Sequence, residues 1–433
     1  MRAHPVEPRT AHRALALLVL LYIVNYIDRQ VLSVLLEPIK RDLGASDAAM
    51  GLLSGLAFAL FYTTAGVPIA RFADRGSRRS VIVWGVVVWS AMTAVCGLAR
   101  NFWQLAAARV GVGIGEAALN PAAHSLISDY FPAERRATAL AIFNMGGNVG
   151  VMLGFIAGGF IGETLGWRTA FMVVGLPGLA LALFTRFALW EPPRGIGDGM
   201  RAATVGGAAE DAPTFREVAT FMLSQRTFVH VSLASAFYVF AAYGFTIWGA
   251  SFLIRVHGLS LTETGVAMGL VQGIGGGLGT FLGGFLTDRY GRGDARALVF
   301  VPALGGLLSA PLLLLFLFAP SSDLALAGYA PAMVFSVFFV GPSYSVVQGL
   351  ARVRMRAQAA ALVLLTMNLI GLGIAPLVVG ALNDALTARF GDEAIRYSLI
   401  VAAAASFWAV LHSLLAARTI RADLAARMRD PIR

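Results

Sequence analysis

The sequence predicts an all-α membrane protein with twelve transmembrane helices in two pseudo-symmetric bundles of six. Three observations predict this fold class. Of 433 residues, 58% are hydrophobic and only 13% are charged, the mean hydropathy is +0.73, and one motif occurs once in each half of the chain. A soluble domain carries about twice this share of charged residues, so the composition argues against a water-soluble fold.

Apolar runs long enough to cross a bilayer as a helix, about 20 residues, recur along the whole chain. In the first half they fall near residues 14–36, 48–70, 80–99, 102–126, 137–162 and 167–189. In the second half they fall near residues 227–254, 264–286, 295–318, 325–349, 358–383 and 395–417. We therefore expect an N-terminal bundle over residues 1–190, a linker over 191–226, a C-terminal bundle over 227–418 and a tail over 419–433.

Basic residues gather in alternate loops. Of the 34 lysines and arginines, 25 lie on the side of both termini and 7 on the other side, while Arg29 and Arg109 lie within spans. By the positive-inside rule, both termini, the linker and the tail are expected to be cytoplasmic. This topology explains the net charge of +10 without a nucleic-acid partner. Arginine outnumbers lysine 33 to 1, which points to a GC-rich bacterium and hence to the bacterial inner membrane.

The linker ends in a pattern typical of a helix start. Thr214 and Glu217 have the spacing of a capping box, and an apolar face follows them. We interpret this as a short interfacial helix, although a chance Thr-x-x-Glu is the alternative.

Several chemistries are excluded by single residues. The only lysine, Lys40, does not follow a glycine-rich phosphate loop, so an ATP-driven pump of that type is excluded. The only cysteine, Cys96, lies in an apolar run, where it is expected to be a small core residue. His124, His230 and His412 lack metal-ligand spacing. We predict no enzyme activity, no cofactor and no metal site.

An internal repeat divides the chain in two. The segment 72–79, FADRGSRR, is echoed by LTDRYGR at 286–292, so that the two aspartates are 214 positions apart. The turn at 49–52, AMGL, likewise recurs at 267–270. We therefore expect the chain to consist of two duplicated halves. In transporters built this way the substrate route lies between the repeats, near the bilayer midplane.

The two Asp-Arg loops resemble the signature of the major facilitator superfamily, and this resemblance covers the whole chain. It implies two six-helix bundles that work by alternating access. Within the superfamily, the segments 25–30, 109–121 and 146–159 resemble the Spinster-like lipid transporters. Tyr-x-Asp-Arg in the first span and Arg-x6-Glu in the fourth also occur in the organic-anion symporters of the superfamily, which remain an alternative.

Four ionisable residues lie inside predicted spans, all in the first half. We assign proton coupling to Asp28 and Glu116, and substrate binding or a charge switch to Arg109 and Arg29, because an ionisable group at bilayer depth is costly unless it is paired or hydrated. Helical rise puts Asp28 and Arg109 at one level and Glu116 roughly 10 Å deeper. The alternative is a structural ion pair between the first and fourth helices.

The repeated loops are interpreted as a cytoplasmic gate. Their aspartates can cap helices of the other half, and their arginines can pair with acidic residues or lipid headgroups. The candidate gate residues are Asp74, Arg75, Arg78, Arg79, Asp288, Arg289 and Arg292. The alternative, ordinary positive-inside charge, explains most of the arginines but not the repeated aspartate.

Two further sets have weaker assignments. The glycines between 146 and 159 form a stripe of small residues that resembles the superfamily's antiporter motif, with Phe155 where proline is usual. Polar and aromatic residues near the expected cavity are lining candidates, with simple packing as the alternative for the aromatics of span seven. This set is Tyr26, Tyr238, Tyr243, Trp248, Asn148 and Asn368.

Taken with the Spinster resemblance, these residues predict a proton-coupled secondary transporter of an amphipathic lipid, of the lysophospholipid or sphingoid phosphate type. The alternatives are a proton symporter of small organic anions such as sugar acids, and multidrug efflux. The expected partners are the substrate, protons and membrane lipids, and the protein is expected to be a monomer.

Overall fold

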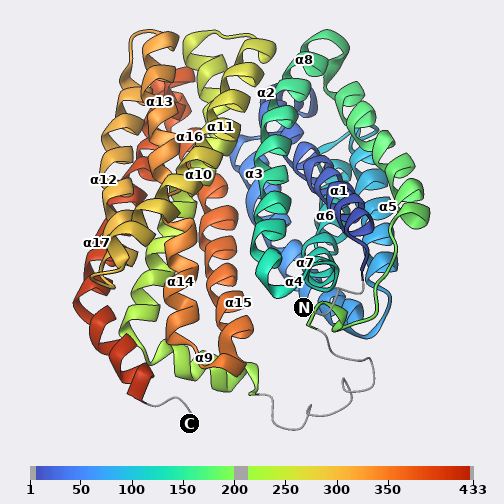
Figure 1. Ribbon diagram of the computed structural model, residues 1–433. Coiled ribbons are helices and arrows are strands. Elements are labelled where there is room, and N and C mark those ends of the chain that lie inside the picture. The colour runs from blue at the N-terminus through green and yellow to red at the C-terminus, as the bar shows by residue number, and fades with distance from the viewer. Residues whose placement is uncertain (1–5, 199–212, 430–433) are drawn as a thin grey trace. The chain divides into compact units, whose positions relative to one another are not determined.

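The computed structural model describes residues 6–198 and 213–429, and within them every regular element is a helix (Figure 1). The chain divides into two compact units. The first is drawn from Met1–Ala45, Ala57–Ala209 and Ser260–Gly269, and the second from Ser46–Leu56, Glu210–Leu259 and Leu270–Arg433.

The first unit is a helical bundle around α1 and α8. Its helices are α1 (Pro8–Val34), α2 (Leu36–Leu43), α4 (Phe58–Arg75), α5 (Arg78–Cys96), α6 (Phe102–Glu116), α7 (Leu119–Tyr130), α8 (Ala133–Ala188) and the 3-10 turn η2 (Ile196–Asp198). Gly166 breaks α8 into two arms with a φ of +82°, a left-handed conformation that glycine adopts without steric cost. Helix α1 packs along α8, and α5 packs against both α6 and α8.

Glycines allow α1 and α8 to approach closely. A Cβ added at Gly150 would lie 2.5 Å from the carbonyl oxygen of Ile23, and one at Gly154 would lie 2.9 Å from the Cβ of Gln30. Small residues at a helix interface give this kind of backbone approach in membranes. Packing against α1 therefore accounts for much of the glycine pattern that resembles an antiporter motif.

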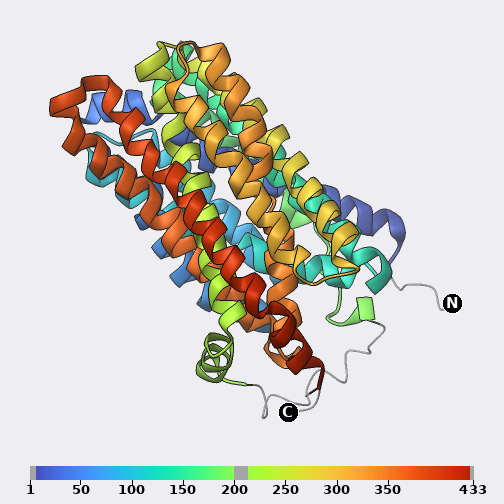
Figure 2. The ribbon, with the colours of Figure 1, turned by 90° about the vertical axis from the view of Figure 1, so that its left-hand side faces the viewer.

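The second unit is organised along α10 and α17. Its helices are α3 (Asp47–Leu52), α9 (Phe215–Leu223), α10 (Arg226–His257), α12 (Ala297–Phe318), α13 (Ser322–Ser336), α14 (Val340–Leu350), η4 (Val353–Met355), α15 (Arg356–Thr366), η5 (Met367–Ile374), α16 (Ala375–Phe390), η6 (Gly391–Glu393) and α17 (Ala394–Arg429). Helix α17 packs against α10 and α12, and its length is visible in Figure 2. The π-helix η1 (Leu53–Ala57) and α11 (Leu261–Gly291) contribute residues to both units.

Side-chain caps explain where several helices begin. Ser77, Asn101 and Ser321 accept hydrogen bonds from the backbone N–H three residues on, at the starts of α5, α6 and α13. At α9 both bonds of the predicted capping box between Thr214 and Glu217 are present. A helix therefore begins where the pattern predicts one, and it packs against α10 and α15.

Within the described residues, nine helical stretches are long and apolar enough to cross a membrane. The stretch Ala133–Ala188 has 56 residues, roughly 80 Å of helix, which is enough for more than one crossing. The predicted span 102–126 differs from the structure, because α6 and α7 are separate helices. The N–H of Ala118 bonds to the carbonyl of Gly115, three residues back, and this tight turn interrupts the helix.

Candidate functional site

The four ionisable residues predicted inside spans gather in the first unit, on α1 and α6. Asp28 is 0% exposed, Glu116 1% and Arg109 2%, while the side chain of Arg29 is 13% exposed. Burying charged groups is costly unless they are paired and hydrogen-bonded. The partners of each group therefore decide what the cluster can do.

Arg29 and Glu116 form an ion pair. The Arg29 Nη2 lies 2.5 Å from the Oε2 of Glu116, and its Nε lies 3.1 Å from the same oxygen. The other oxygen, Oε1, is buried, and no described residue bonds to it. This ion pair joins the first and fourth predicted spans, as expected if the charges serve as a structural ion pair. The arginine that pairs with Glu116 is Arg29 and not Arg109. One carboxylate oxygen remains available for a proton or a ligand.

Aromatic rings surround the Arg29 guanidinium. Its carbon Cζ lies 5.1 Å from the ring centroid of Tyr26, 4.7 Å from that of Phe58 and 5.3 Å from that of Tyr62. Cation–π contacts of this kind stabilise a cation without neutralising it. Sequence reasoning missed Phe58 and Tyr62, although their i, i+4 spacing on α4 places both on one face of the helix.

Within the described part of the chain, the carboxylate of Asp28 has no ion-pair partner comparable to that of Glu116. Neither carboxylate oxygen receives a hydrogen bond from any residue that the structure describes. The Arg109 Nη1 lies 3.4 Å from the backbone carbonyl oxygen of Asp28, and the Arg109 guanidinium makes no hydrogen bond to the Asp28 carboxylate. The Nε of Arg109 is also buried without a described partner. The two groups are thus adjacent, and their side chains are not bonded to each other.

Hydroxyl and amide groups extend the cluster. The hydroxyls of Tyr22 and Tyr26 lie 3.5 Å apart, and the Asn120 Nδ2 donates to the hydroxyl of Tyr62 at 3.3 Å. Tyr22 and Tyr26 come from α1, Tyr62 from α4 and Asn120 from α7. These groups give the cluster hydrogen-bonding capacity beside its charges, which is what a polar headgroup requires.

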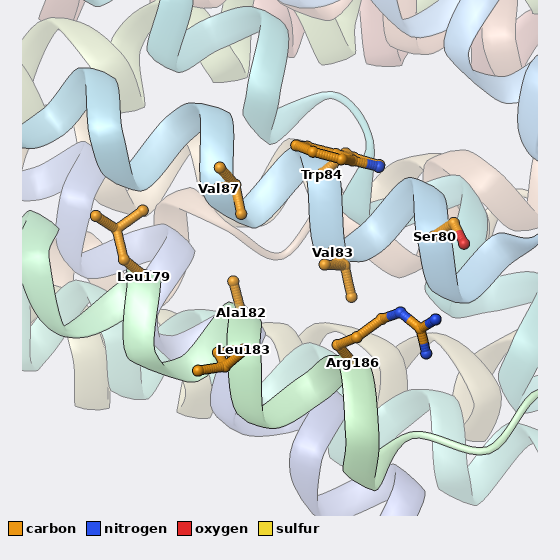
Figure 3. Close-up of a pocket in the computed structure, with 8 residues that line it drawn as sticks. All are labelled: Ser80, Val83, Trp84, Val87, Leu179, Ala182, Leu183 and Arg186. Carbon is orange, nitrogen blue, oxygen red and sulfur yellow. The ribbon is translucent and has the colours of Figure 1, made fainter.

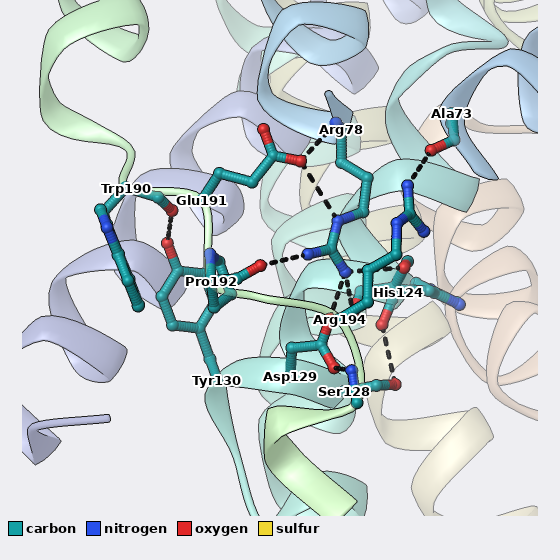
Figure 4. Close-up of polar contacts among 12 residues, drawn as sticks. Ala73, Arg78, His124, Ser128, Asp129, Tyr130, Trp190, Glu191, Pro192 and Arg194 are labelled. Atoms are coloured by element: carbon teal, nitrogen blue, oxygen red, sulfur yellow. Dashed lines mark hydrogen bonds and ion pairs between the residues drawn. The ribbon is translucent and has the colours of Figure 1, made fainter. Parts of the chain in front are cut away.

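A second network is centred on Arg78, which is 1% exposed (Figure 4). Its guanidinium pairs with Asp129 and donates to the carbonyl of Pro192 at 2.7 Å and to the Ser125 Oγ at 3.0 Å. Glu191 accepts from the Arg78 backbone N–H at 2.7 Å. Arg78 therefore fastens α5 to α7 and to the chain that follows α8.

Glu191 is held ionised by this network. Partial burial alone would raise the pKa of Glu191, but hydrogen bonds from Ser77 and from the Arg78 backbone, together with the Arg78 charge, hold that pKa below its usual value. Arg194 extends the same contacts, because its Nη2 donates to the carbonyls of Ala73 and Gly76 at 2.5 and 2.9 Å. These bonds fix the loop of the first Asp-Arg motif.

The other motif residues are placed differently. Arg79 is half-buried and donates weakly to the carbonyl of Leu189 at 3.5 Å. The remaining described side chains are exposed and have no bonding partner among the described residues: Arg75, Asp288, Arg289 and Arg292. The side chain of Asp74 lies outside the described part. The gate assigned to these loops stays a prediction.

A family model described as Major Facilitator Superfamily matches residues 18–376. The chain belongs to this superfamily. It is accordingly a membrane-spanning transporter and not an enzyme, as the paired loops predicted.

Three similar proteins indicate where the chain lies within the superfamily. An MFS-type efflux pump of Mycolicibacterium smegmatis is 33% identical over 404 residues, 92% of this chain and 90% of that protein. The crystal structure of a bacterial homologue of the human lysosomal transporter Spinster, in an inward-facing and occupied conformation, has a TM-score of 0.85 at 32% identity, covering 96% of this chain and 99% of that one. A probable L-galactonate transporter of Escherichia coli is 34% identical over 170 residues, 39% of this chain and 37% of that protein. The chain is thus related to Spinster and to sugar-acid transporters.

The lining candidates outside the cluster have mixed surroundings. In the second unit of this major facilitator protein, the Tyr238 hydroxyl donates to the carbonyl of Pro302 at 2.8 Å, and the Trp248 Nε1 donates to the carbonyl of Pro376 at 2.9 Å. Both side chains are buried, and their assignment as lining residues stays a prediction. Three other candidates outside the cluster are half-buried: Tyr243, Asn148 and Asn368. Tyr26, within the cluster, is half-buried as well.

The second unit contains a buried ion pair that sequence reasoning missed. The Arg255 Nη1 lies 2.6 Å from the Oδ2 of Asp47, and both side chains are less than one-tenth exposed. Asp384 accepts hydrogen bonds from the backbone N–H groups of Asp47 and Ala48 at 2.9 and 2.8 Å, at the start of α3. Asp47 and Arg255 fall just outside the predicted spans, which is why neither was counted as an intramembrane charge.

Proposed function

We propose that this chain is a proton-coupled secondary transporter that moves an amphipathic anionic or zwitterionic lipid, of the lysophospholipid or sphingoid phosphate type, by alternating access. The observation that carries the proposal is the buried Asp28 carboxylate, which lacks a hydrogen-bond partner among the described residues and lies next to Arg109. Ionisable groups at bilayer depth mark proton relays and substrate routes by default.

Proton coupling follows from the arrangement of charges. Burial disfavours the charged form of Asp28 and the positive charge of the nearby Arg109 favours it, so the ionisation of Asp28 depends on both. An anionic headgroup that binds either arginine withdraws its charge from the neighbouring carboxylate. Proton binding, substrate binding and conformation are then linked, because a ligand shifts an equilibrium only through its different affinity for the two states.

The Spinster relationship supports a lipid substrate, and the aromatic surroundings of Arg29 suit an amphipathic molecule with a charged head. Two alternatives are each favoured by a relative. The mycobacterial MFS-type efflux pump favours multidrug efflux for this chain, and the probable L-galactonate transporter favours symport of sugar acids. In the second alternative Arg109 would hold the substrate carboxylate.

The topology proposed with this function is that of a bacterial inner-membrane protein with both termini in the cytoplasm, working as a monomer. The bias of 25 basic residues against 7 supports this orientation.

Transport by purified protein in liposomes tests the proposal. Uptake of a labelled lysophospholipid and of labelled glucuronate would be measured with and without an imposed pH gradient. The expected result is lysophospholipid movement that the gradient accelerates, with no glucuronate movement. Gradient-driven glucuronate uptake without lipid movement would support the sugar-acid alternative, and lipid movement that ignores the gradient would contradict proton coupling.

A further inference from the structure

A groove separate from the charged cluster runs along the outside of the first unit, between α5 and the second arm of α8 (Figure 3). It has a volume of about 390 Å³, which is within the range of small-molecule sites. Eight residues line it: Ser80, Val83, Trp84, Val87, Leu179, Ala182, Leu183 and Arg186. Neither the mechanism proposed above nor the repeated motif uses this groove.

Each wall of the groove is one face of a helix. The lining positions of α5 follow the spacing i, i+3, i+4, i+7 from Ser80, and those of α8 follow the same spacing from Leu179. Figure 3 shows Leu179 near Val87 at one end, and Arg186 near Ser80 and Val83 at the other. The groove is therefore about 10 Å long, apolar through most of its length, with a cation and a hydroxyl at one end.

The apolar part faces outward. Trp84 is 68% and Leu183 64% exposed, and the neighbouring Phe187 is 78% exposed. Large apolar side chains exposed together on the surface of a membrane protein lie against lipid, since water would disfavour them. The groove is thus open to acyl chains.

The polar end of the groove carries the positively charged side chain of Arg186. Arg186 is exposed, and no described residue hydrogen-bonds to or pairs with its guanidinium. It lies two residues before the C-terminal end of α8, where a long side chain can reach the headgroup layer from an apolar helix. Basic pockets between transmembrane helices at such a level bind anionic lipid headgroups.

We propose that this groove binds one anionic phospholipid of the surrounding bilayer. One acyl chain lies along Val83, Val87 and Leu179, Arg186 forms a charge-assisted hydrogen bond with the phosphate, and Ser80 donates to it. The bound lipid joins α5 to α8 and does not pass through the charged cluster. The proposal is therefore independent of the transported substrate.

Native mass spectrometry of the purified full-length chain tests the site. The protein would be equilibrated with equal amounts of phosphatidylglycerol and phosphatidylcholine that carry the same acyl chains. Arg186→Ala is expected to lower the affinity of one phosphatidylglycerol about fivefold, the effect of one basic residue at a membrane surface. Arg135→Ala removes the same charge from an exposed position elsewhere on α8 and is the matched control.

A second variant tests the apolar part. Ala182 is buried in the groove, so Ala182→Phe occupies the space of the acyl chain while Arg186 remains. We expect this variant to lose the same phosphatidylglycerol. Lipid with brominated acyl chains provides a direct reading, because quenching assigned to Trp84, by comparison with Trp84→Phe, should be stronger for phosphatidylglycerol than for phosphatidylcholine and lose that preference in Arg186→Ala.

Three results would overturn the proposal. These are equal retention of the two lipids by the wild type, equal effects of Arg186→Ala and Arg135→Ala, and unchanged retention in Ala182→Phe. The first would mean that the groove does not select an anionic headgroup, the second that Arg186 contributes only diffuse surface charge, and the third that no acyl chain lies in the groove.

Discussion

Arg29 and Glu116 join α1 to α6 through a single carboxylate oxygen, Oε2, which accepts from two guanidinium nitrogens at 2.5 and 3.1 Å. The other oxygen of Glu116 is buried and receives no bond from a described residue. The pair is therefore a brace between two helices that keeps one acceptor unused. In the proposed transport cycle, the anionic headgroup of the substrate replaces Glu116 as the partner of Arg29.

Glu116→Gln should destabilise the protein, because it removes the negative charge that pairs with Arg29 in a buried place. Breaking one side of a buried pair costs about 3 kcal/mol or more. Thermal unfolding in detergent would measure the loss, with Glu134→Gln, an exposed position on α8, as the control. Equal melting temperatures for the two variants would contradict the pairing.

Asp28→Asn should leave the fold intact and abolish acceleration of transport by a pH gradient. The carboxylate oxygens of Asp28 receive no hydrogen bond from a described residue, so the substitution removes a titratable group and its attraction to Arg109 but no hydrogen bond. Transport into liposomes would be compared at equal protein content, with monodispersity and melting temperature as controls. A gradient response like that of the wild type would assign proton coupling elsewhere.

Arg78→Ala should lower the free energy of unfolding by about 3 kcal/mol or more, since Asp129 and part of the Glu191 network lose a buried partner. Arg75→Ala removes a similar charge from the same loop at an exposed position and should change stability by less than about 0.5 kcal/mol. Denaturation of both variants provides the measurement. Similar losses would show that the loop depends on its total charge.

Stability should depend on the ionisation of Glu191. Its pKa in the folded protein lies below the usual 4.5, so its contribution is fully present above about pH 4.5 and is lost as the pH falls through the lower, folded-state pKa. The melting temperature of the wild type should therefore fall more steeply below pH 4.5 than that of Glu191→Gln. Parallel curves would contradict the role of the Ser77 and Arg78 bonds.

The predicted orientation can be tested with introduced cysteines. The native Cys96 is buried, as expected from its apolar surroundings, and gives a low labelling background. Arg216→Cys on α9 and Ala388→Cys on α16 are exposed positions, and the charge bias places them on opposite sides of the membrane. In intact cells an impermeant thiol reagent should label Ala388→Cys alone. Labelling of both, or of Arg216→Cys alone, would contradict the topology.

Local patterns in the sequence predict the helical class and the family of this protein. The length of the apolar spans, the Asp-Arg motif of each repeated loop and the Thr214–Glu217 capping box each depend on residues close together in the chain, so they do not require knowledge of how the helices pack. The same holds for the ionisable residues of α1 and α6, because their cost in a bilayer is a property of the residue and its depth. The sequence alone therefore determined the family, the helical class and the candidate residues.

Only the tertiary structure decided which groups meet. The sequence placed Arg109 and Glu116 on one face of a helix, but it did not show that Glu116 bonds to Arg29 on another helix, α1. Arg78 reaches Asp129 and Glu191, 51 and 113 positions away, and Asp47 reaches Arg255 across 208 positions. Such pairings depend on how helix faces are rotated against each other, and hydrophobic periodicity leaves that rotation open when a span is apolar on all sides.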